Sequence, residues 1–265
     1  MPTTLPVSSR LIARVIARVI ALGLGALLLV ATAPAQAITV DELVHHIDRL
    51  WHGETSRATM TMAVKTQRYQ REMQLEAWSL GKDYSLVVIE KPIKDRGIAT
   101  LKVEENIWNY LPKIDRVTKI PSSMMSGSWM GSHFTNDDLV RESYFEDDYE
   151  SAISFEGERD GRRIYELTAI PRPEAPVVWG RVVLEIDQDT LAPITSRYYD
   201  EAGELVRTMT FDKVEQIDNR AVPMRLTLQP EDKPTESTVI TYQDITFGVP
   251  IERSFFSLQN LERRR

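Results

Sequence analysis

The chain has 265 residues, of which 39 are acidic, 32 are Lys or Arg and none is cysteine, so its formal net charge at pH 7 is −7. This acidic balance argues against a nucleic-acid-binding protein and against a polybasic grip on anionic lipid headgroups, because both need clustered Lys and Arg. The lack of cysteine excludes disulfides, thiolate metal ligands and a lipoprotein acylation site.

The N-terminal segment has the three parts of a secretory signal peptide. It begins with a positively charged part that holds Arg10, Arg14 and Arg18. An apolar run, Val19–Ala33, follows, and an Ala-Gln-Ala cleavage pattern ends at Ala37. We therefore predict a signal peptide over residues 1–37, cleaved after Ala37, and export to the periplasm. An uncleaved anchor is the alternative if Leu11–Ile16 is counted with the apolar run, but two arginines interrupt that longer stretch.

Residues 38–265 are expected to form one soluble domain without a lipid anchor. Loss of the three arginines with the signal peptide changes the formal net charge from −7 to −10. The roughly 228 residues that remain are enough for one domain with a substantial core and rather few for two. No glycine-rich linker and no repeat of fixed period divides them.

A helix is predicted from Val40 to His52. Thr39 and Glu42 have the spacing of a capping box. Apolar residues recur at helical spacing, and we expect them to be buried together: Val40, Leu43, Val44, Ile47 and Leu50. The opposite face is polar and should remain exposed at Asp41, Glu42, Asp48 and Arg49.

Beyond this helix, apolar and polar residues alternate with a period of two, which is typical of β-strands. The alternation predicts about a dozen strands, at residues 59–64, 73–78, 84–90, 97–103, 107–111, 153–158, 163–170, 181–186, 194–199, 205–214, 222–228 and 239–245. Turn residues such as Asp160-Gly161 separate successive runs, so neighbouring strands should pair as antiparallel hairpins in one curved meander.

Several predicted strands are apolar on both faces. Residues 85–89 read Ser-Leu-Val-Val-Ile, and Trp108 and Tyr110 alternate with further apolar residues. A sheet covered on one side only would be polar on the other, so both faces of the central sheet must be covered. Besides the N-terminal helix, helical patterns occur at residues 136–141 and 251–256. We expect these helices to cover one face incompletely and to leave a groove.

The connection between residues 121 and 143 is too long and too apolar for a turn. It is rich in Met and small residues and holds Trp129 and Phe134, a density of large apolar side chains that disordered segments lack. Methionine is flexible and suits a surface that meets chains of variable shape. Two interpretations remain open: a flap over an apolar cavity, or a loop whose apolar residues plug the core.

The residues with catalytic or metal-binding potential form no known constellation. The four histidines lack the His-Glu-x-x-His pattern, and Gly127-Ser-Trp-Met-Gly131 holds its serine in the wrong place for a nucleophile elbow. The acidic pairs Asp137-Asp138 and Asp147-Asp148 lack the spacing of a calcium loop, and we expect Asp137 to cap a short helix. The chain is therefore predicted to be no enzyme, with no metal site and no cofactor.

Several stretches resemble a known family. They are Ser126–Leu139, the Met-rich strand after Thr55-Ser56, the Glu90-Lys-Pro92 turn and the ending Asp244–Phe256. They resemble LolA-like outer membrane lipoprotein-sorting proteins, which are periplasmic carriers. The resemblance implies a mainly β fold with few helices (α+β), namely an incomplete antiparallel β-barrel, or half-barrel, closed by short helices. In the family, the apolar space between sheet and helices takes up acyl chains.

The predicted groove and the resemblance together favour a periplasmic carrier that moves a lipid or lipoprotein from the inner toward the outer membrane. We expect the flap, residues 122–134, to close an apolar cavity over the concave face of the sheet. A subset of the following residues should line that cavity and bind lipid: Met60, Met62, Trp78, Leu86, Val88, Trp108, Tyr110, Met124, Met125, Trp129, Met130, Met209, Phe211, Met224 and Leu226.

Two other functions remain open. A periplasmic adaptor would dock on an inner-membrane exporter without cargo of its own, which predicts a core filled by side chains. A hydrolase of lipid-like substrates would need a reactive nucleophile that the sequence does not reveal. For the carrier, the resemblance implies an inner-membrane exporter of the ABC or RND type as a partner, and we expect a monomer that binds no nucleic acid.

Overall fold

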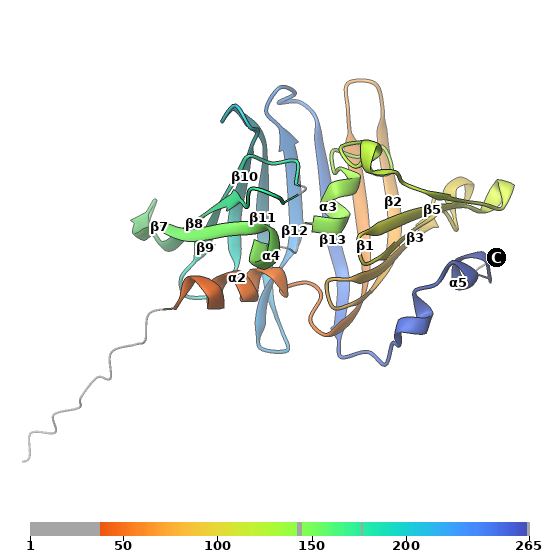
Figure 1. Cartoon of the computed structure of the whole chain (residues 1–265), viewed down its shortest axis with the longest axis horizontal. Helices are drawn as coiled ribbons and strands as arrows, with labels where there is room; N and C mark the ends of the chain where they lie inside the picture. The colour runs from red at the N-terminus through yellow and green to blue at the C-terminus, as the bar shows by residue number, and fades with distance from the viewer. Residues whose placement is uncertain (1–37, 142–144, 176, 264–265) are drawn as a thin grey trace, which may run out of the picture. The chain divides into compact units, whose positions relative to one another are not determined.

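Thirteen antiparallel strands form one sheet in the computed structural model, which describes residues 38–141, 145–175 and 177–263 (Figure 1). The strands are β1 (Thr55–Lys65), β2 (Gln70–Leu80), β3 (Tyr84–Lys91), β4 (Ala99–Val103), β5 (Asn106–Leu111), β6 (Arg116–Lys119), β7 (Tyr149–Arg159), β8 (Arg162–Pro171), β9 (Arg181–Asp187), β10 (Pro193–Tyr199), β11 (Leu205–Ile217), β12 (Arg220–Pro230) and β13 (Ser237–Phe247). The predicted signal peptide lies outside the described residues and stays a prediction.

The strand order is β6-β5-β4-β3-β2-β1-β13-β12-β11-β10-β9-β8-β7. Strands that follow one another along the chain pair with each other, apart from β6 and β7, and the first strand, β1, also pairs with the last, β13. The two open edges are therefore β6 and β7, which follow one another along the chain. This unclosed antiparallel sheet confirms the prediction of an incomplete barrel, and the connection from β6 to β7 has to run from one open edge to the other.

All the predicted strands are present, and one strand was missed. The missed strand is β6, which has only four residues and is mostly exposed. It pairs with β5 through Trp108 and Lys119 at one end and Leu111 and Arg116 at the other. Its sequence, Arg-Val-Thr-Lys, has one apolar residue and so carries no alternation to detect.

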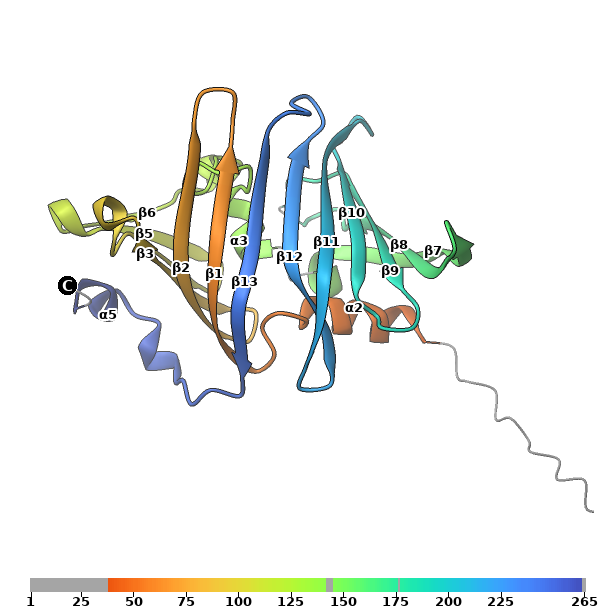
Figure 2. The same cartoon turned by 180° about the vertical axis from the view of Figure 1, so that it is seen from behind.

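Helix α2 (Val40–Asp48) begins with the predicted capping box between Thr39 and Glu42. Leu43, Val44, Ile47 and Leu50 are buried as expected, and Val40 is partly buried against the same core. The helix ends at Asp48, four residues before the predicted end at His52. It contacts α4 (Phe145–Asp148) and β7, and it lies on one side of the sheet, as Figures 1 and 2 show.

The prediction that Asp48 is exposed is wrong, because only 5% of its surface is accessible. Its carboxylate accepts hydrogen bonds from the backbone N–H groups of Phe145 (3.3 Å) and Glu146 (3.0 Å), which begin helix α4. Free N–H groups at a helix start need acceptors, and Asp48 supplies them from another helix. A helical wheel cannot reveal a partner nearly one hundred residues away.

The two faces of the sheet carry two separate hydrophobic cores. The larger one lies on the concave face, against α2 and the connection between the open edges. The smaller one lies on the other face of β2–β5, where Phe256 and Leu261 of the C-terminal segment pack against Trp78, Leu86 and Leu101. That segment, residues 249–263, contains η4 (Arg253–Phe255) and α5 (Leu258–Arg263). The prediction that both faces must be covered is therefore confirmed.

The connection from β6 to β7 holds most of the remaining helical structure. It contains the short 3-10 turn η3 (Ser122–Met124), then α3 (Asn136–Arg141), then α4. Two further 3-10 turns, η1 (Ile93–Asp95) and η2 (Pro112–Ile114), lie in the β3–β4 and β5–β6 connections. Figure 2 shows α2 and α3 behind the sheet, on its concave side.

Candidate functional site

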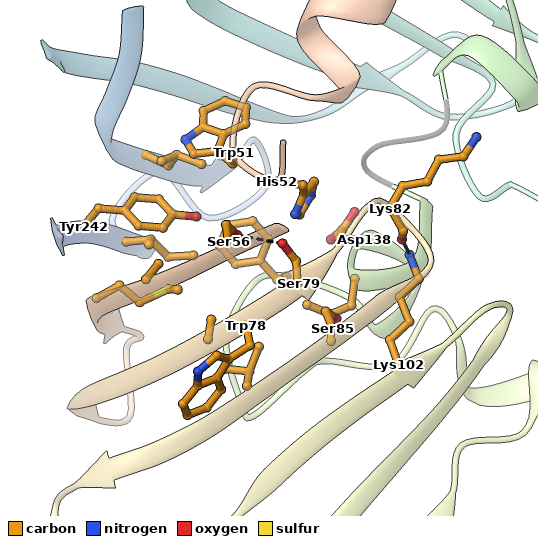
Figure 3. Close-up of a pocket in the computed structure, with 18 of the residues that line it drawn as sticks. Trp51, His52, Ser56, Trp78, Ser79, Lys82, Ser85, Lys102, Asp138 and Tyr242 are labelled. Atoms are coloured by element: carbon orange, nitrogen blue, oxygen red, sulfur yellow. Dashed lines mark hydrogen bonds between the residues drawn. The ribbon is translucent and has the colours of Figure 1, made fainter. Parts of the chain in front are cut away.

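A cavity of about 150 Å³ lies between the concave face of the sheet and the flap. Met60, Leu226 and Ile240 line it from three adjacent strands, and Trp129 and Phe134 line it from the flap. Figure 3 shows this space, with Trp51 and Tyr242 at one side. Apolar side chains from segments far apart in the sequence thus form part of the cavity wall.

The flap enters the cavity through a tight turn. The backbone N–H of Trp129 donates to the Phe134 carbonyl oxygen at 2.8 Å, and Met130 and Gly131 between them have positive φ angles of 50° and 72°. The turn brings the Trp129 and Phe134 rings to the same side, where each is 3% exposed. The indole N–H of Trp129 donates to the Thr100 hydroxyl of β4 at 3.0 Å, which fixes the ring.

The helix after the flap is held to the sheet by a buried ion pair. Arg207 of β11 donates two hydrogen bonds to the Asp138 carboxylate, at 2.7 and 2.5 Å, and both side chains are almost fully buried. The Arg207 guanidinium also lies over the rings of Trp179 and Tyr198, 4.3 and 4.2 Å from their centroids. This pair joins α3 to strand β11.

The cap of helix α3 differs from the prediction. The Asp138 backbone N–H donates to the Thr135 hydroxyl at 3.1 Å, and the Thr135 N–H donates to the Asp138 carboxylate at 2.7 Å. This reciprocal pair is a capping box in which aspartate replaces the usual Glu or Gln. Thr135, and not Asp137, therefore caps the helix, and Asp138 serves both the cap and the ion pair.

The outer rim of the flap is fastened to two hairpins of the sheet. His133 contacts the Thr238 hydroxyl (2.8 Å) and the Glu236 carboxylate (3.1 Å). The Tyr69 hydroxyl donates to the Gly131 carbonyl oxygen at 2.6 Å. The backbone N–H of Gln67 and the contact with His133 lower the pKa of Glu236. The rim contacts are polar, in contrast to the apolar contacts beneath them.

The structure divides the residues predicted to bind lipid among three regions. Eight belong to the core on the concave face: Met60, Met62, Trp129, Met130, Met209, Phe211, Met224 and Leu226. Five belong to the core on the other face: Trp78, Leu86, Val88, Trp108 and Tyr110. Met124 is 55% exposed on the flap, and Met125 is half-buried there.

Four of the predicted residues line the cavity itself: Met60, Trp78, Trp129 and Leu226. Trp78 borders the cavity, but its ring packs against Phe255 of the C-terminal segment at a centroid distance of 5.7 Å. Alternation identifies the two faces of each strand without saying which face is concave. That assignment depends on the pairing register, which brings the six strand residues of the concave core together, whereas Trp129 and Met130 come from the flap.

One end of the cavity is polar, which was not predicted from the sequence. Ser56, Ser79, Ser85 and Lys102 line this end together with His52. Burial and the nearby positive charge of Lys102 lower the pKa of His52 to about 4. The serines occur singly on separate strands, so only the cross-strand register could have revealed them as a group.

Two smaller spaces continue the cavity along the concave face. A space of about 90 Å³ shares Trp51, His52, Leu226 and Tyr242 with the main cavity. A third, of about 20 Å³, lies beside Asp138, Phe145 and Tyr198.

Two further properties concern the described residues only. In residues 38–141, 145–175 and 177–263, no three His, Asp or Glu side chains are grouped so that they could hold a metal ion. No helix in those same ranges combines the length and the apolar character needed to cross a membrane.

Comparisons with known proteins agree with this architecture. A family model described as an uncharacterized protein matches residues 81–263. A DUF1329 family protein from Desulfovibrio piger is 24% identical, with 83% of this chain and 97% of that chain covered and a TM-score of 0.76. A protein domain named for outer membrane lipoprotein sorting, from Vibrio parahaemolyticus, is 22% identical, with 83% and 97% covered and a TM-score of 0.71.

A LolA superfamily protein from Nitrosomonas europaea is 19% identical, with 84% of this chain and 100% of that chain covered and a TM-score of 0.72. No curated protein matches the sequence. The three structural matches confirm the predicted resemblance to LolA-like proteins at the level of the fold.

Proposed function

Because the chain belongs to the family of uncharacterized proteins whose model matches residues 81–263, and because it has the fold of LolA superfamily structures, we propose that it is a carrier. The carrier holds acyl chains of a lipid or lipoprotein in the cavity beneath the flap, and it moves them through the periplasm from the inner toward the outer membrane. It has no catalytic role and acts as a monomer. Its donor is an inner-membrane exporter of the ABC or RND type.

The observation that supports this proposal best is the apolar cavity under the connection between the two open edges. Met60, Leu226 and Ile240 of the sheet face Trp129 and Phe134 of the flap across it. Transfer of each methylene from water into such a space contributes about 0.8 kcal/mol. Association costs about 4–15 kcal/mol, so burial of roughly five to nineteen methylenes offsets it.

The size of the cavity requires the flap to move when cargo binds. The space of about 150 Å³ is smaller than the roughly 300–1,000 Å³ of ordinary ligand pockets. Trp129 and Phe134 fill the volume that an acyl chain would take, so cargo must displace them. The flap is a connection held at its rim by side-chain hydrogen bonds, and such segments open at lower free energy than core strands.

A second candidate function is the periplasmic adaptor that docks on an exporter and carries no cargo. The small volume of the cavity favours this alternative, because an adaptor needs only a core filled by side chains. In the adaptor, Trp129 stays in the cavity as part of the core. In the carrier, Trp129 leaves the cavity when cargo binds.

Uptake of a fluorescent fatty acid separates the two functions. In a carrier, Trp129→Glu places a charge where the acyl chain lies, so it should weaken uptake at least ~10-fold, the cost of leaving one charge poorly solvated. Met124→Glu is the matched control, because Met124 is on the same flap but 55% exposed. Its uptake should equal that of the wild type. If the wild type takes up no probe, or if both variants take it up normally while folded, the adaptor is the better proposal.

A further inference from the structure

Two short turns at one end of the sheet carry strongly exposed apolar side chains. Ile93 in η1 is 86% exposed and Ile114 in η2 is 64% exposed, the two highest values for large apolar side chains among the described residues. Isoleucine is one of the residue types that are most often fully buried. A single exposed isoleucine needs no explanation, but two of them on neighbouring turns suggest a contact with something outside the chain.

The two turns lie side by side. The antiparallel pairing of β3 with β4 and of β4 with β5 puts the β3–β4 and β5–β6 connections at the same end of the strands. Gly97 of the first connection lies so close to the Pro112 ring that a methyl group on Gly97 would be 3.3 Å from it. Figures 1 and 2 both show the two turns next to each other, in yellow and yellow-green. We call residues 91–96 and 111–116 together the paired turns.

Basic residues surround the two isoleucines, although the chain as a whole is acidic. The paired turns hold five Lys or Arg and two Asp. The Asp95 carboxylate pairs with Arg71 at 3.0 Å, and the Asp115 carboxylate accepts from the Tyr110 hydroxyl at 3.0 Å. In the part of the chain that the structure describes, four of the five basic side chains have no ion pair: Lys91, Lys94, Lys113 and Arg116. Net charge does not record position, so it hides this local excess of positive charge.

Exposed isoleucines between lysines and arginines fit the surface of an anionic bilayer. The apolar side chains can enter the boundary between headgroups and acyl chains. The long basic side chains beside them can keep their charges at the level of the phosphates. A protein partner fits less well, because Lys and Asp are depleted in protein interfaces. Charge complementarity therefore favours a membrane as the occupant of the paired turns.

One side chain joins the paired turns to the flap. The Arg71 guanidinium of β2 donates to the Asp95 carboxylate of η1 at 3.0 Å and to the Met130 carbonyl oxygen of the flap at 3.2 Å. Met130 follows Trp129, which lines the cavity. A bilayer bound to the paired turns would therefore be close to the segment that covers the cavity.

We propose that the paired turns dock the protein on the surface of an anionic lipid bilayer, with Ile93 and Ile114 inserted among the headgroups and the basic side chains at the phosphates. This docking goes beyond the proposed function, because it applies to a carrier and to an adaptor alike. Two isoleucines bury less apolar surface than a myristoyl chain, which itself binds membranes only reversibly. The docking is therefore transient.

Vesicle flotation tests the proposal on the protein recovered from the periplasm, after its mass has verified that residues 1–37 are absent. The vesicles consist of phosphatidylcholine alone or of equal parts of phosphatidylcholine and phosphatidylglycerol. We expect binding to the anionic vesicles to be at least ~10-fold tighter. A rise in salt from about 0.1 to about 1 M shortens the Debye length from about 10 to about 3 Å, so it should remove most of that difference.

Substitutions then assign the binding to the paired turns. Ile93→Ser with Ile114→Ser should weaken binding to anionic vesicles at least ~10-fold, because it removes the inserted side chains. Lys94→Glu with Lys113→Glu should abolish the preference for anionic vesicles. All four positions are exposed, so these variants should fold. The matched control makes the same two kinds of change at exposed positions of β11 and should bind like the wild type: Lys213→Glu with Val214→Ser.

A fluorescent label reports the insertion itself. Because the chain has no cysteine, Ile114→Cys gives a single site for a fluorophore whose emission depends on the polarity around it. Anionic vesicles should shift this emission to shorter wavelength. The same label at Val214→Cys should show no shift.

The outcomes separate docking from the function of the cavity. Fatty-acid uptake without vesicles should be normal in the paired-turn variants, so their loss of vesicle binding would not reflect a damaged cavity. Docking on lipid is wrong if the wild type binds neither kind of vesicle, and a protein partner then becomes the better occupant. It is equally wrong if the paired-turn variants bind like the wild type, or if the β11 control loses as much binding as they do.

Discussion

Asp48, Lys102 and Asp138 are three of the charged residues that are buried in the described part of the chain. Asp138 binds Arg207 and fixes α3. Asp48 accepts from the first N–H groups of α4. Lys102 lies in the wall of the cavity. Apolar side chains alone could fill the core of a mainly β protein. Each of these charged groups therefore has a positional or binding role, which a substitution can test.

The Arg207–Asp138 pair should be essential for stability when only one partner is removed. Arg207→Met leaves a buried carboxylate without its cation, which costs about 3–5 kcal/mol of unfolding free energy. The double variant Arg207→Met, Asp138→Leu should recover most of that loss. Urea denaturation measures both, with Arg163→Met as the control, because the Arg163–Asp189 pair is exposed and contributes at most about 1 kcal/mol. An equal, small loss in all three variants would contradict the assigned role.

Asp48 should make the stability of the protein depend on pH. Burial raises the pKa of its carboxyl from 3.8 to about 7, although the backbone N–H groups of Glu146 and Phe145 act in the opposite direction. Between these two values the folded state keeps a proton that the unfolded state has released. The unfolding free energy should therefore fall as pH rises from about 4 to about 7, by up to ~1.4 kcal/mol per pH unit from this group.

Asp48→Asn removes this titration and should flatten the pH profile of stability in that window. The urea midpoints of the wild type and the variant are measured at pH 4, 5, 6 and 7. The difference between the two midpoints should shrink or reverse as the Asp48 carboxyl of the wild type loses its proton. Parallel profiles over the whole window would show that the Asp48 pKa is not raised.

Among the elements, a connection and the C-terminal segment cover the two apolar faces of the sheet. The C-terminal segment covers the apolar face of β2–β5, with the Tyr84 and Phe256 rings 5.8 Å apart. The flap and α3 cover the concave face. Neither cover is part of the sheet, so their contributions to stability and to binding can be tested one at a time.

The strands were predictable from the sequence because alternation is a local property, as at Met60, Met62 and Val64. The site was predictable only in part. Trp129 was expected at the cavity because a large aromatic ring in a long connection needs a place to be buried. Lys102 was not expected there, because only the cross-strand register aligns it with Ser56, Ser79 and Ser85, which come from three other strands.

Phe256→Ala should expose the smaller hydrophobic core, on the face of β2–β5 that is not concave, to solvent. The side chain is 4% exposed, so its truncation should cost about 3–5 kcal/mol and expose Trp78 to solvent. Urea denaturation followed by tryptophan fluorescence reports both effects. Leu258→Ala on the neighbouring helix is the matched control, because Leu258 is 40% exposed, and it should change stability by less than about 1 kcal/mol. Equal losses in the two variants would show that the segment does not cover this face.

A reversible cross-link should show that the flap has to open. The backbone N–H of His133 donates to the Thr238 hydroxyl at 3.0 Å, so a cysteine pair at these two positions joins the flap to β13 in a chain that has no other cysteine. Oxidised protein should take up the fluorescent fatty acid at least ~10-fold more slowly than the same protein after reduction. Equal uptake rates in both forms, with the cross-link verified by mass, would contradict flap opening.

At the scale of the whole molecule, the sheet is a meander whose two open edges are kept apart from other chains by charge. Edge strand β6 is short and carries Arg116 and Lys119, and edge strand β7 carries Glu150, Glu156 and Glu158. Short and charged edge strands oppose edge-to-edge pairing. In the proposed carrier function, the flap occupies the concave face of the unclosed barrel until cargo displaces it.

Mass spectrometry of organic extracts tests the proposed carrier function most directly. The wild-type protein is recovered from the periplasm by osmotic shock, purified without detergent and extracted beside two controls, the Trp129→Glu variant and an unrelated periplasmic protein of similar size. We predict acyl lipids in the wild-type extract in an amount comparable to the protein, and much less in both controls. A wild-type extract with no more lipid than the controls would contradict the carrier and leave the adaptor as the better account.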